Sequence, residues 1–271
     1  MSPLPLLAAG AATGLIGSIL GIGGGIFLVP ALVLWFDVPI AHAAGAGLVA
    51  VIATSTAASA SNVKKGTANM PLGLVLETTT VLGAITGGLL AAHSPERAVI
   101  FVFGILLAVI SLLLWRDPAK DSAKTAPARG VLRGEYYDPA ERRTVRYGVR
   151  RMPTALSAGF FAGNLSGLLG VGGGVLKVPV LHLWCGVPMK AAAATSNFMI
   201  GVTAAAGAIV YFGHGRLDAP LSATVALGVL AGSTIGARTA GRLRDQWLRR
   251  GFSALTLFLA LQMLRRALGQ S

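Results

Sequence analysis

Two copies of one glycine-rich phrase contain the residues best suited to hold a solute. The phrases are "GIGGGIFLVP" over residues 21–30 and "GVGGGVLKVP" over residues 170–179. Adjacent glycines interrupt a helix, because each costs about 1 kcal/mol in a helix interior relative to alanine. The helix that restarts presents free backbone N–H groups and a positive dipole end, which favour an anion. The expected contacts are Gly23, Gly24, Gly25, Gly172, Gly173 and Gly174; alternatively, these glycines only permit close helix packing.

Two ionisable side chains lie inside apolar stretches. Lys177 follows the second glycine cluster, where the first copy has Leu28, and Glu77 lies within "PLGLVLETTTVLG". A charge in lipid costs at least about 2.5 kcal/mol, so it is usually functional or paired. We expect Lys177 to contact the substrate or, alternatively, to extend to the lipid headgroups. Glu77 is a candidate for carrying a coupling proton or balancing Lys177, and a structural hydrogen bond to the adjacent threonines is an equal alternative.

Hydroxyl and amide side chains form a further group of candidates. The stretch "AAAATSNFMIGVTAAAG" contains a polar triplet, and Thr203 follows two turns later on a similar helix face. Such groups donate hydrogen bonds to an oxyanion, although they also hold membrane helices together. The first half has Ala46, Gly47 and Leu48 at the triplet, which predicts an asymmetric site. The candidates are Thr195, Ser196, Asn197, Asn164, Thr54 and Asn62.

The sequence motifs indicate neither an enzyme nor a metal-binding protein. The histidines are scattered and Cys185 is the only cysteine, so neither a metal site nor an intrachain disulfide is expected. The chain contains no HExxH, no GxxxxGK[ST] and no GxSxG motif. We therefore expect no catalytic residue, no metal and no cofactor, and the chain is not expected to be an enzyme.

The composition identifies a membrane protein. Of the 271 residues, 54% are hydrophobic and 12% are charged, and the mean hydropathy is +0.70. The net charge of +13 comes from residues that flank apolar runs, which is typical of cytoplasmic loops and argues against nucleic-acid binding. Residues 1–7 lack the basic residues of a signal peptide, so we expect the first apolar run to remain in the fold.

The chain consists of two related halves joined by a polar linker. Residues 1–115 and 153–271 form membrane repeats, and residues 116–152 form a basic cytoplasmic linker with ten Lys or Arg and five Asp or Glu. The repeats align at an offset of 149 residues, and 11 of 19 positions are identical between Gly21 and Pro39 and their counterparts. Each half is expected to contain a glycine-broken, re-entrant helical segment and three transmembrane helices. The expected spans are 39–62, 71–92, 97–115, 188–211, 217–240 and 247–268.

Charge predicts that the two repeats have opposite orientations. If each half crosses the bilayer an odd number of times, Lys64, Lys65, the linker, Lys190 and the basic residues of 238–250 all face the cytoplasm. Arg216, Arg265 and Arg266 then face outward, but they are fewer. The predicted fold class is an all-α membrane protein of two inverted-topology repeats, an architecture found in secondary transporters.

With both glycine phrases, "NVKKG" and "ATSNF" in view, the chain resembles the TauE/SafE sulfite exporter family of membrane permeases over residues 4–268. The resemblance implies transport of sulfite or organosulfonates across a bacterial cytoplasmic membrane. Ala46 and Gly47 depart from the family's Thr and Ser, and the linker is longer than the family pattern suggests. We expect an exporter that works by alternating access, with the bilayer and a small anion as partners and a proton or sodium ion as a possible coupling ion. A scaffold or assembly factor, with a partner bound by the linker, and an anion channel are the alternatives; the sequence gives no oligomeric state.

Overall fold

The computed structural model describes residues 3–20, 24–64, 66–115, 132–138, 142–239 and 245–269, and it is mainly helical. The first half forms α1 (Pro3–Leu20), α2 (Gly25–Phe36), α3 (Ile40–Lys64), α4 (Met70–His93) and α5 (Glu96–Trp115). A hairpin of β1 (Gly134–Asp138) and β2 (Arg143–Tyr147) follows. The second half forms α6 (Met152–Leu169), α7 (Gly174–Pro179), η2 (Val180–Trp184), α8 (Met189–Gly213), α9 (Ala219–Thr239) and α10 (Asp245–Ala267).

The two halves share their helix boundaries. Adding the offset of 149 residues to both ends of α1 gives the ends of α6, and the same shift relates α3 to α8. Equivalent residues also terminate these helices, since Gly66 and Gly215 follow α3 and α8 with φ of 66° and 65°. Just before the next helix of each half, the side-chain oxygens of Asn69 and Asp218 accept a hydrogen bond from the backbone N–H three residues later. The distances are 3.1 and 3.0 Å. The repeat in the sequence is therefore also a repeat of local structure.

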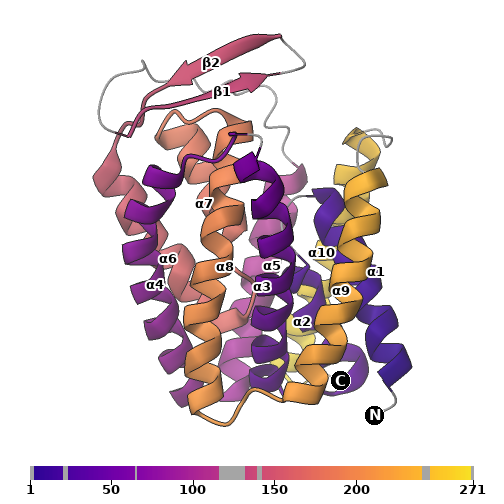
Figure 1. Ribbon diagram of the computed structural model, residues 1–271. Coiled ribbons are helices and arrows are strands. Elements are labelled where there is room, and N and C mark those ends of the chain that lie inside the picture. The colour runs from indigo at the N-terminus through magenta and orange to yellow at the C-terminus, as the bar shows by residue number, and fades with distance from the viewer. Residues whose placement is uncertain are drawn as a thin grey trace.

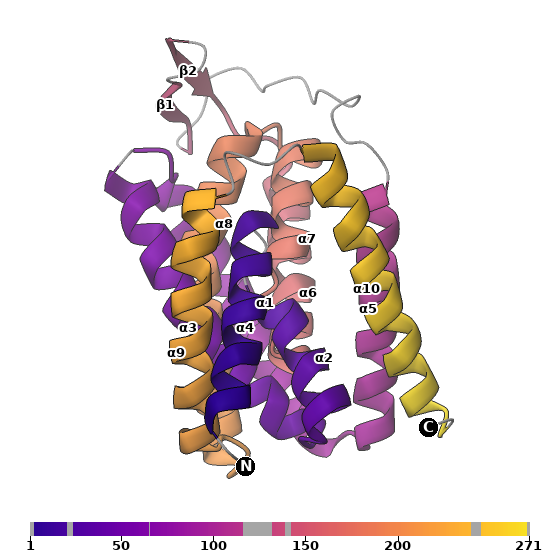
Figure 2. The ribbon, with the colours of Figure 1, turned by 90° about the vertical axis from the view of Figure 1, so that its right-hand side faces the viewer.

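Polar contacts define which helix ends lie together. At the end that carries the hairpin, the backbone N–H of Asn69 at the start of α4 donates to Thr195 Oγ1 of α8 at 2.9 Å. We call this the hairpin end, which is uppermost in Figure 1, and we call the opposite end, where both termini lie, the far end. At the far end, the N–H of Ile40 at the start of α3 donates to Glu96 Oε1 at the start of α5. Helices α4, α8 and α10 end at the far end, whereas α3, α5 and α9 begin there (Figures 1 and 2).

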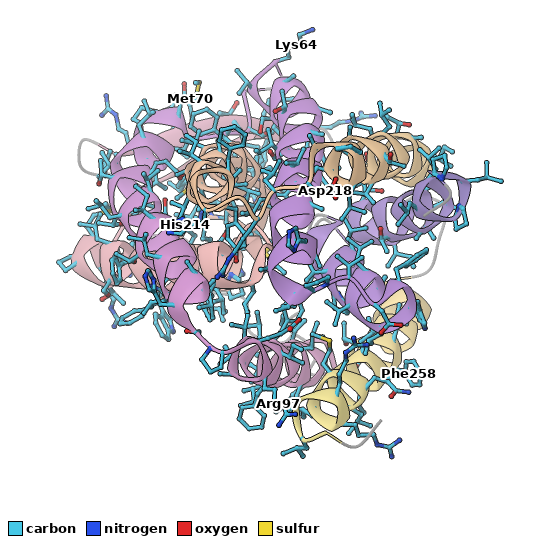
Figure 3. The ribbon with its side chains drawn as sticks, turned by 90° about the horizontal axis from the view of Figure 1, so that it is seen from below. Lys64, Met70, Arg97, His214, Asp218 and Phe258 are labelled. Carbon is cyan, nitrogen blue, oxygen red and sulfur yellow. The ribbon has the colours of Figure 1, made fainter. Side chains whose placement is uncertain are left out.

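Helices from different halves pack against each other as matched pairs. Helix α1 lies along α9, and its counterpart α6 lies along α4. The third pair, α5 with α10, stands beside the other helices when the molecule is viewed along its axis, where Arg97 and Phe258 mark it in Figure 3. Ser111 and Ser253 join this pair, because each hydroxyl donates to the other residue's carbonyl oxygen, at 2.8 and 2.9 Å.

Glycines allow the backbones of α4 and α6 to touch. A Cβ at Gly163 would collide with the Thr80 carbonyl oxygen, and one at Gly87 would collide with the Asn164 carbonyl oxygen. The α1 and α9 pair repeats this arrangement, with Gly232 against Ala11. Small residues at such crossings are the usual means of helix association in membranes.

Gly163→Val is therefore expected to separate α6 from α4 and to destabilise the protein by at least about 1–3 kcal/mol, the usual cost of overpacking. The thermal midpoint of the purified protein in detergent measures this effect. Gly213→Ala is the matched control, because a Cβ at Gly213 meets nothing within 4 Å. Equal midpoints for the two variants would contradict the tight crossing.

The linker between the two halves contains regular secondary structure that its sequence did not predict. The predicted all-α fold includes no strand in the linker over 116–152, but an antiparallel hairpin occupies part of it, with Tyr136 opposite Val145. Tyr136 and Tyr147 are buried against Leu72 and Leu181, so the aromatic faces of the strands anchor the hairpin on the helices. Burial raises the pKa of the Tyr147 hydroxyl, which keeps this group neutral. Residues 116–131 and 139–141 lie outside the described residues.

Five helices among the described residues are long and apolar enough to cross a membrane: α3, α4, the 96–113 part of α5, α8 and the 219–236 part of α9. The sixth expected span, 247–268, corresponds to α10, which has 23 residues but a lower mean hydropathy. Large apolar side chains such as Leu82, Ile209 and Leu227 are more than half exposed, as expected for faces that contact lipid. The chain is a multi-pass membrane protein.

Candidate functional site

The helical segments break at both glycine clusters. Helix α6 ends at Leu169, and the chain then turns through residues with positive φ, namely Gly170 (75°), Gly172 (78°) and Gly173 (68°). Helix α7 begins at Gly174 and continues into the wider turn of η2 after Pro179, which has no N–H to donate. The first break lies between α1 and α2, where Gly24 has an ordinary φ of −69°. Gly23 lies outside the described residues.

The two breaks are in contact with each other. A Cβ at Gly25 would lie 3.1 Å from the carbonyl oxygen of Gly170, and a Cβ at Gly47 would lie 2.7 Å from the same oxygen. Gly170 in turn packs against the backbone of Ala44. Glycine is thus required where the first break, α3 and the second break meet, so close packing and the interruption of the helices occur together.

Two buried hydroxyls without partners flank the second break. Ser166 is 0% exposed and Ser196 is 1% exposed, and the Oγ atom of each has no hydrogen-bond partner among the described residues. A Cβ at Gly173 would lie 3.3 Å from the Ser166 Cβ, and one at Gly174 would lie 3.5 Å from Ser196 Oγ. A buried polar atom that lacks a partner is costly and is a sign of a missing ligand or water.

The backbone at the second break also has free donors. The N–H groups of Gly172 and Gly173 donate to no carbonyl among the described residues. Gly173 accepts instead, through its carbonyl oxygen, from the N–H groups of Leu176 and Lys177 at 3.3 Å each. The second break therefore combines N–H and O–H donors in one place, which is the chemistry of an oxyanion site.

A buried chain of polar side chains lies next to this break and joins three helices. Lys177 of α7 is 3% exposed, and its Nζ donates to Thr203 Oγ1 of α8 at 2.8 Å. The Thr203 hydroxyl lies 2.6 Å from Glu77 Oε1 of α4, to which it donates, and Thr80 lies alongside. The other carboxylate oxygen, Oε2, is buried and has no partner among the described residues. The alternative that Lys177 reaches the lipid headgroups is wrong, because its ammonium lies inside the helix bundle.

The remaining expected contacts are distributed over the molecule. Thr195 accepts the N–H of Asn69. Asn164 donates to Thr86 Oγ1 on α4 at 3.1 Å, and the hydroxyl of Thr54 donates to carbonyl oxygens of its own helix. Asn62 accepts through its backbone carbonyl at the end of α3, and Asn197 is half-buried on α8. Among the expected polar side chains, the structure brings Lys177, Ser196 and Glu77 towards the second break.

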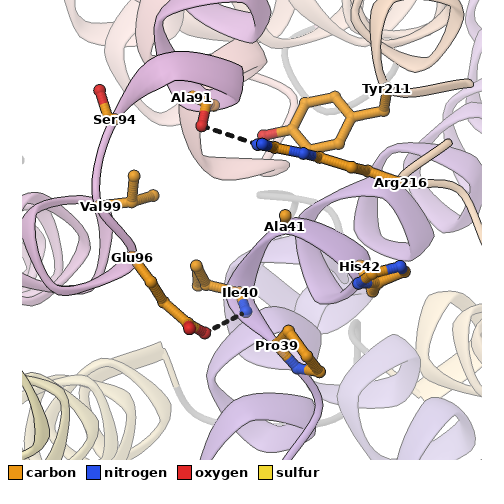
Figure 4. A pocket seen from close by; sticks show the side chains of 10 residues that line it. All are labelled: Pro39, Ile40, Ala41, His42, Ala91, Ser94, Glu96, Val99, Tyr211 and Arg216. Atoms are coloured by element: carbon orange, nitrogen blue, oxygen red, sulfur yellow. Dashed lines mark hydrogen bonds between the residues drawn. The ribbon is translucent and has the colours of Figure 1, made fainter. Parts of the chain in front are cut away.

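A cavity of about 290 Å³ opens at the far end (Figure 4). Arg216 and Tyr211 line one side of it, while Glu96 and His42 line the other. The Tyr211 hydroxyl donates to the carbonyl of Leu168, two residues before Gly170, at 3.0 Å. A residue that lines the cavity is therefore hydrogen-bonded to the last turn of α6, just before the second break.

Charged groups at this cavity hold helix ends in place. The Arg216 guanidinium donates to the carbonyl oxygens of Ala91 and Ala92 at the end of α4, at 3.0 and 2.7 Å. Glu96 lies at the starts of both α3 and α5, where the dipoles favour a negative charge. His42 Nδ1 is buried and has no partner among the described residues. Together with Tyr211, these three side chains give the cavity a polar lining suited to a small polar solute.

Sequence reasoning missed Ser166 and the bridging role of Thr203. In "GNLSGLLG", Ser166 lies among small residues that are typical of helix packing. Its spacing of four residues before Gly170, within the last turn of a broken helix, is the signal that would have pointed to it. Thr203 was expected only as a residue on the same face as the polar triplet.

Comparison with known proteins gives consistent results. Residues 6–263 match the family described as sulfite exporter TauE/SafE. The chain is 29% identical over 244 residues to the probable membrane transporter protein YunE of Bacillus subtilis, covering 88% of each chain. It is 26% identical over 260 residues to a probable membrane transporter protein of Xylella fastidiosa, covering 94% of this chain and 93% of the relative. No solved structure matches it significantly.

Proposed function

Because the chain belongs to the sulfite exporter TauE/SafE family, we propose that it exports small sulfur-containing oxyanions, such as sulfite or organosulfonates, by alternating access. The family and the names of the relatives identify a membrane transporter. The substrate class follows from the family description and from the chemistry of the second break. In this proposal the chain acts as a carrier and performs no covalent chemistry.

The observation that carries this proposal is the pair of buried, unpartnered hydroxyls of Ser166 and Ser196 beside Gly173 and Gly174. Together with free backbone N–H groups and the nearby Lys177 ammonium, they place several hydrogen-bond donors in one region. An oxyanion with several acceptor atoms satisfies such donors. The first break contributes Gly25 to the same contact region, because a Cβ at Gly25 would lie 3.1 Å from the carbonyl oxygen of Gly170.

Alternating access follows from two inverted repeats, residues 1–115 and 153–271, joined by the linker. Support comes from the helix directions, since α3 and α5 begin at the far end while their counterparts α8 and α10 end there. Interrupted helices that meet inside inverted repeats are the usual site of substrate binding in secondary transporters. The far-end cavity and the buried site at the second break then belong to one pathway. Tyr211 and Leu168, which are hydrogen-bonded to each other, separate the cavity from the site.

We place the protein in the bacterial cytoplasmic membrane, with the hairpin end in the cytoplasm. The end of α3, the start of α8 and the segment between β2 and α6 lie at the hairpin end (Figure 1). These parts of the chain contain Lys64, Lys190, Arg150 and Arg151, in agreement with the excess of basic residues on cytoplasmic loops. Helix α10 is included as a span because it runs along α5. The cavity lined by Arg216 then faces outward and serves as the exit.

The double variant Ser166→Ala and Ser196→Ala is expected to raise the KM for the anion by about 10- to 100-fold, the loss of one or two charged hydrogen bonds. The same change should leave the thermal midpoint unchanged or raise it, because it removes two buried groups that lack partners. Flux assays and thermal denaturation measure the two effects. A lower midpoint with an unchanged KM would mean that these serines are structural.

Flux into proteoliposomes containing the purified chain tests the function itself. Sulfite, methanesulfonate, sulfate and acetate are compared, and we expect saturable flux that prefers the sulfur oxyanions. Absence of flux for all four would favour a scaffold or assembly factor. Flux that does not saturate and greatly exceeds about 1,000 ions per second, above typical enzyme-like turnover, would indicate a channel.

A further inference from the structure

The Lys177, Thr203 and Glu77 cluster contains one cation and one acid, both buried and bridged by a single hydroxyl. Thr203 accepts from Lys177 at 2.8 Å and lies 2.6 Å from Glu77 Oε1. The three side chains are 3%, 0% and 5% exposed. If both ionisable groups are charged, the cluster is neutral as a whole, which is the arrangement that a low-dielectric interior tolerates.

Few other ionisable groups lie near Glu77. Helix α6, which packs along α4, has none between Met152 and Leu169. From α7 and α8, Lys177 and Thr203 face the carboxylate, with Thr80 of its own helix beside them. The other ionisable groups of α8 and η2 are Lys190, Tyr211 and His182, of which Tyr211 and His182 bond to the carbonyls of Leu168 and Val187. Lys177 is therefore the charge that balances Glu77.

An anion that binds at the second break disturbs this balance. Lys177 then faces two negative charges, the anion and the carboxylate, and the buried site has a net charge of −1. Burying such an excess charge is strongly unfavourable. A proton on Glu77 removes the excess and leaves one cation for one anion. Oε2 is free to take this proton, because it has no partner among the described residues.

We propose that each anion is carried together with one proton, which binds Glu77, so that transport is electroneutral. This inference rests on the proposed function and adds its coupling ion and stoichiometry. The proton enters from the aqueous side to which the site is open, forms an O–H bond at Glu77, and leaves to water on the opposite side with the anion. The empty site returns with Lys177 and Glu77 paired, so neither the loaded nor the empty form has a net charge.

Proteoliposomes with an internal pH-sensitive dye provide the test, with methanesulfonate as the probe because it remains a monovalent anion at every pH used. For the wild-type protein, we expect one proton per anion and no response of the flux to a potassium diffusion potential. Glu77→Gln should retain flux, move no protons and respond to the potential, because its empty form keeps an unbalanced Lys177. Glu135→Gln, on the exposed hairpin, is the control and should behave as wild type.

A second measurement needs no variant and covers the case in which Glu77→Gln does not fold. Calorimetric titration of the wild-type protein with methanesulfonate, in buffers of different ionisation enthalpy, counts the protons taken up per bound anion. We expect about one proton, and hence an affinity for the anion that falls as the pH rises, by about tenfold per pH unit wherever a full proton is taken up. Flux or binding without proton uptake would overturn the coupling and leave the transporter intact. Absence of wild-type flux with both methanesulfonate and sulfite would instead overturn the proposed function.

Discussion

Lys177→Met is expected to reduce anion flux by at least about 100-fold, since a charge-assisted hydrogen bond is worth about 1.5–3 kcal/mol and the variant also removes the cation that balances Glu77. Lys177→Arg should retain measurable flux because the charge remains. Initial rates in proteoliposomes, normalised to incorporated protein, measure the change. Lys64→Met, at the exposed end of α3, is the control and should transport at the wild-type rate.

A loss of transport in Lys177→Met has two physical sources, and a second variant separates them. Without Lys177, Glu77 is left as a buried charge with no cation, and breaking a buried pair in this way costs about 3–5 kcal/mol. Adding Glu77→Gln restores charge balance. The double variant should therefore recover the thermal midpoint but not the flux. Recovery of flux would show that Lys177 serves only to balance Glu77 and does not contact the substrate.

The cluster is asymmetric in a protein that is otherwise repetitive. At the matching positions of the other half, Lys177 is replaced by Leu28 and Glu77 by Ala226, while Thr203 has Thr54 as its counterpart. Thr54 donates to carbonyl oxygens of its own helix, whereas Thr203 bridges two charges. Only one of the two equivalent positions holds charge in each case, so the two halves differ at this cluster.

The fold was largely accessible from the sequence because its strongest signals are local. Apolar length predicted the span 39–62, close to the observed Ile40–Lys64, and the glycine clusters predicted where the broken helices end. The hairpin was missed because the strands around Tyr136 and Tyr147 are short and lie in a charged linker. Their buried faces become evident only when Leu72 and Leu181, distant in sequence, cover them.

The candidate site was accessible in part. The rule that charges in apolar segments are functional or paired selected Lys177 and Glu77, and the structure joins these two side chains through Thr203. That they meet through Thr203 depends on contacts that span 126 positions between α4 and α8, which no local pattern reveals. Ser166 was missed for a different reason, because a serine in the last turn of a helix resembles a packing residue until its missing partner is seen.

The second prediction compares equivalent glycines of the two breaks. Gly173→Ala is expected to reduce flux by at least about tenfold, because its φ of 68° costs an L-residue about 1–2 kcal/mol and its Cβ would lie 2.7 Å from the Ala162 carbonyl oxygen. Gly24→Ala, 149 positions earlier, has φ of −69°, and its Cβ would mainly meet the Val229 side chain at 2.9 Å. The Val229 methyl group must shift slightly, but Gly24→Ala adds no backbone strain and meets no carbonyl oxygen closer than 3.5 Å, so the loss of flux should stay within about threefold.

The comparison is informative because both variants add the same methyl group to the same motif. Proteoliposome flux gives the functional effect, and thermal denaturation reports whether either protein has lost its fold. Adding methanesulfonate should raise the thermal midpoint of Gly24→Ala as it does that of the wild-type protein, and should not raise that of Gly173→Ala. Equal losses of flux and of stabilisation in the two variants would mean that the anion contacts both breaks alike, and the site would then have to be centred between Gly25 and Gly170, where the two breaks touch.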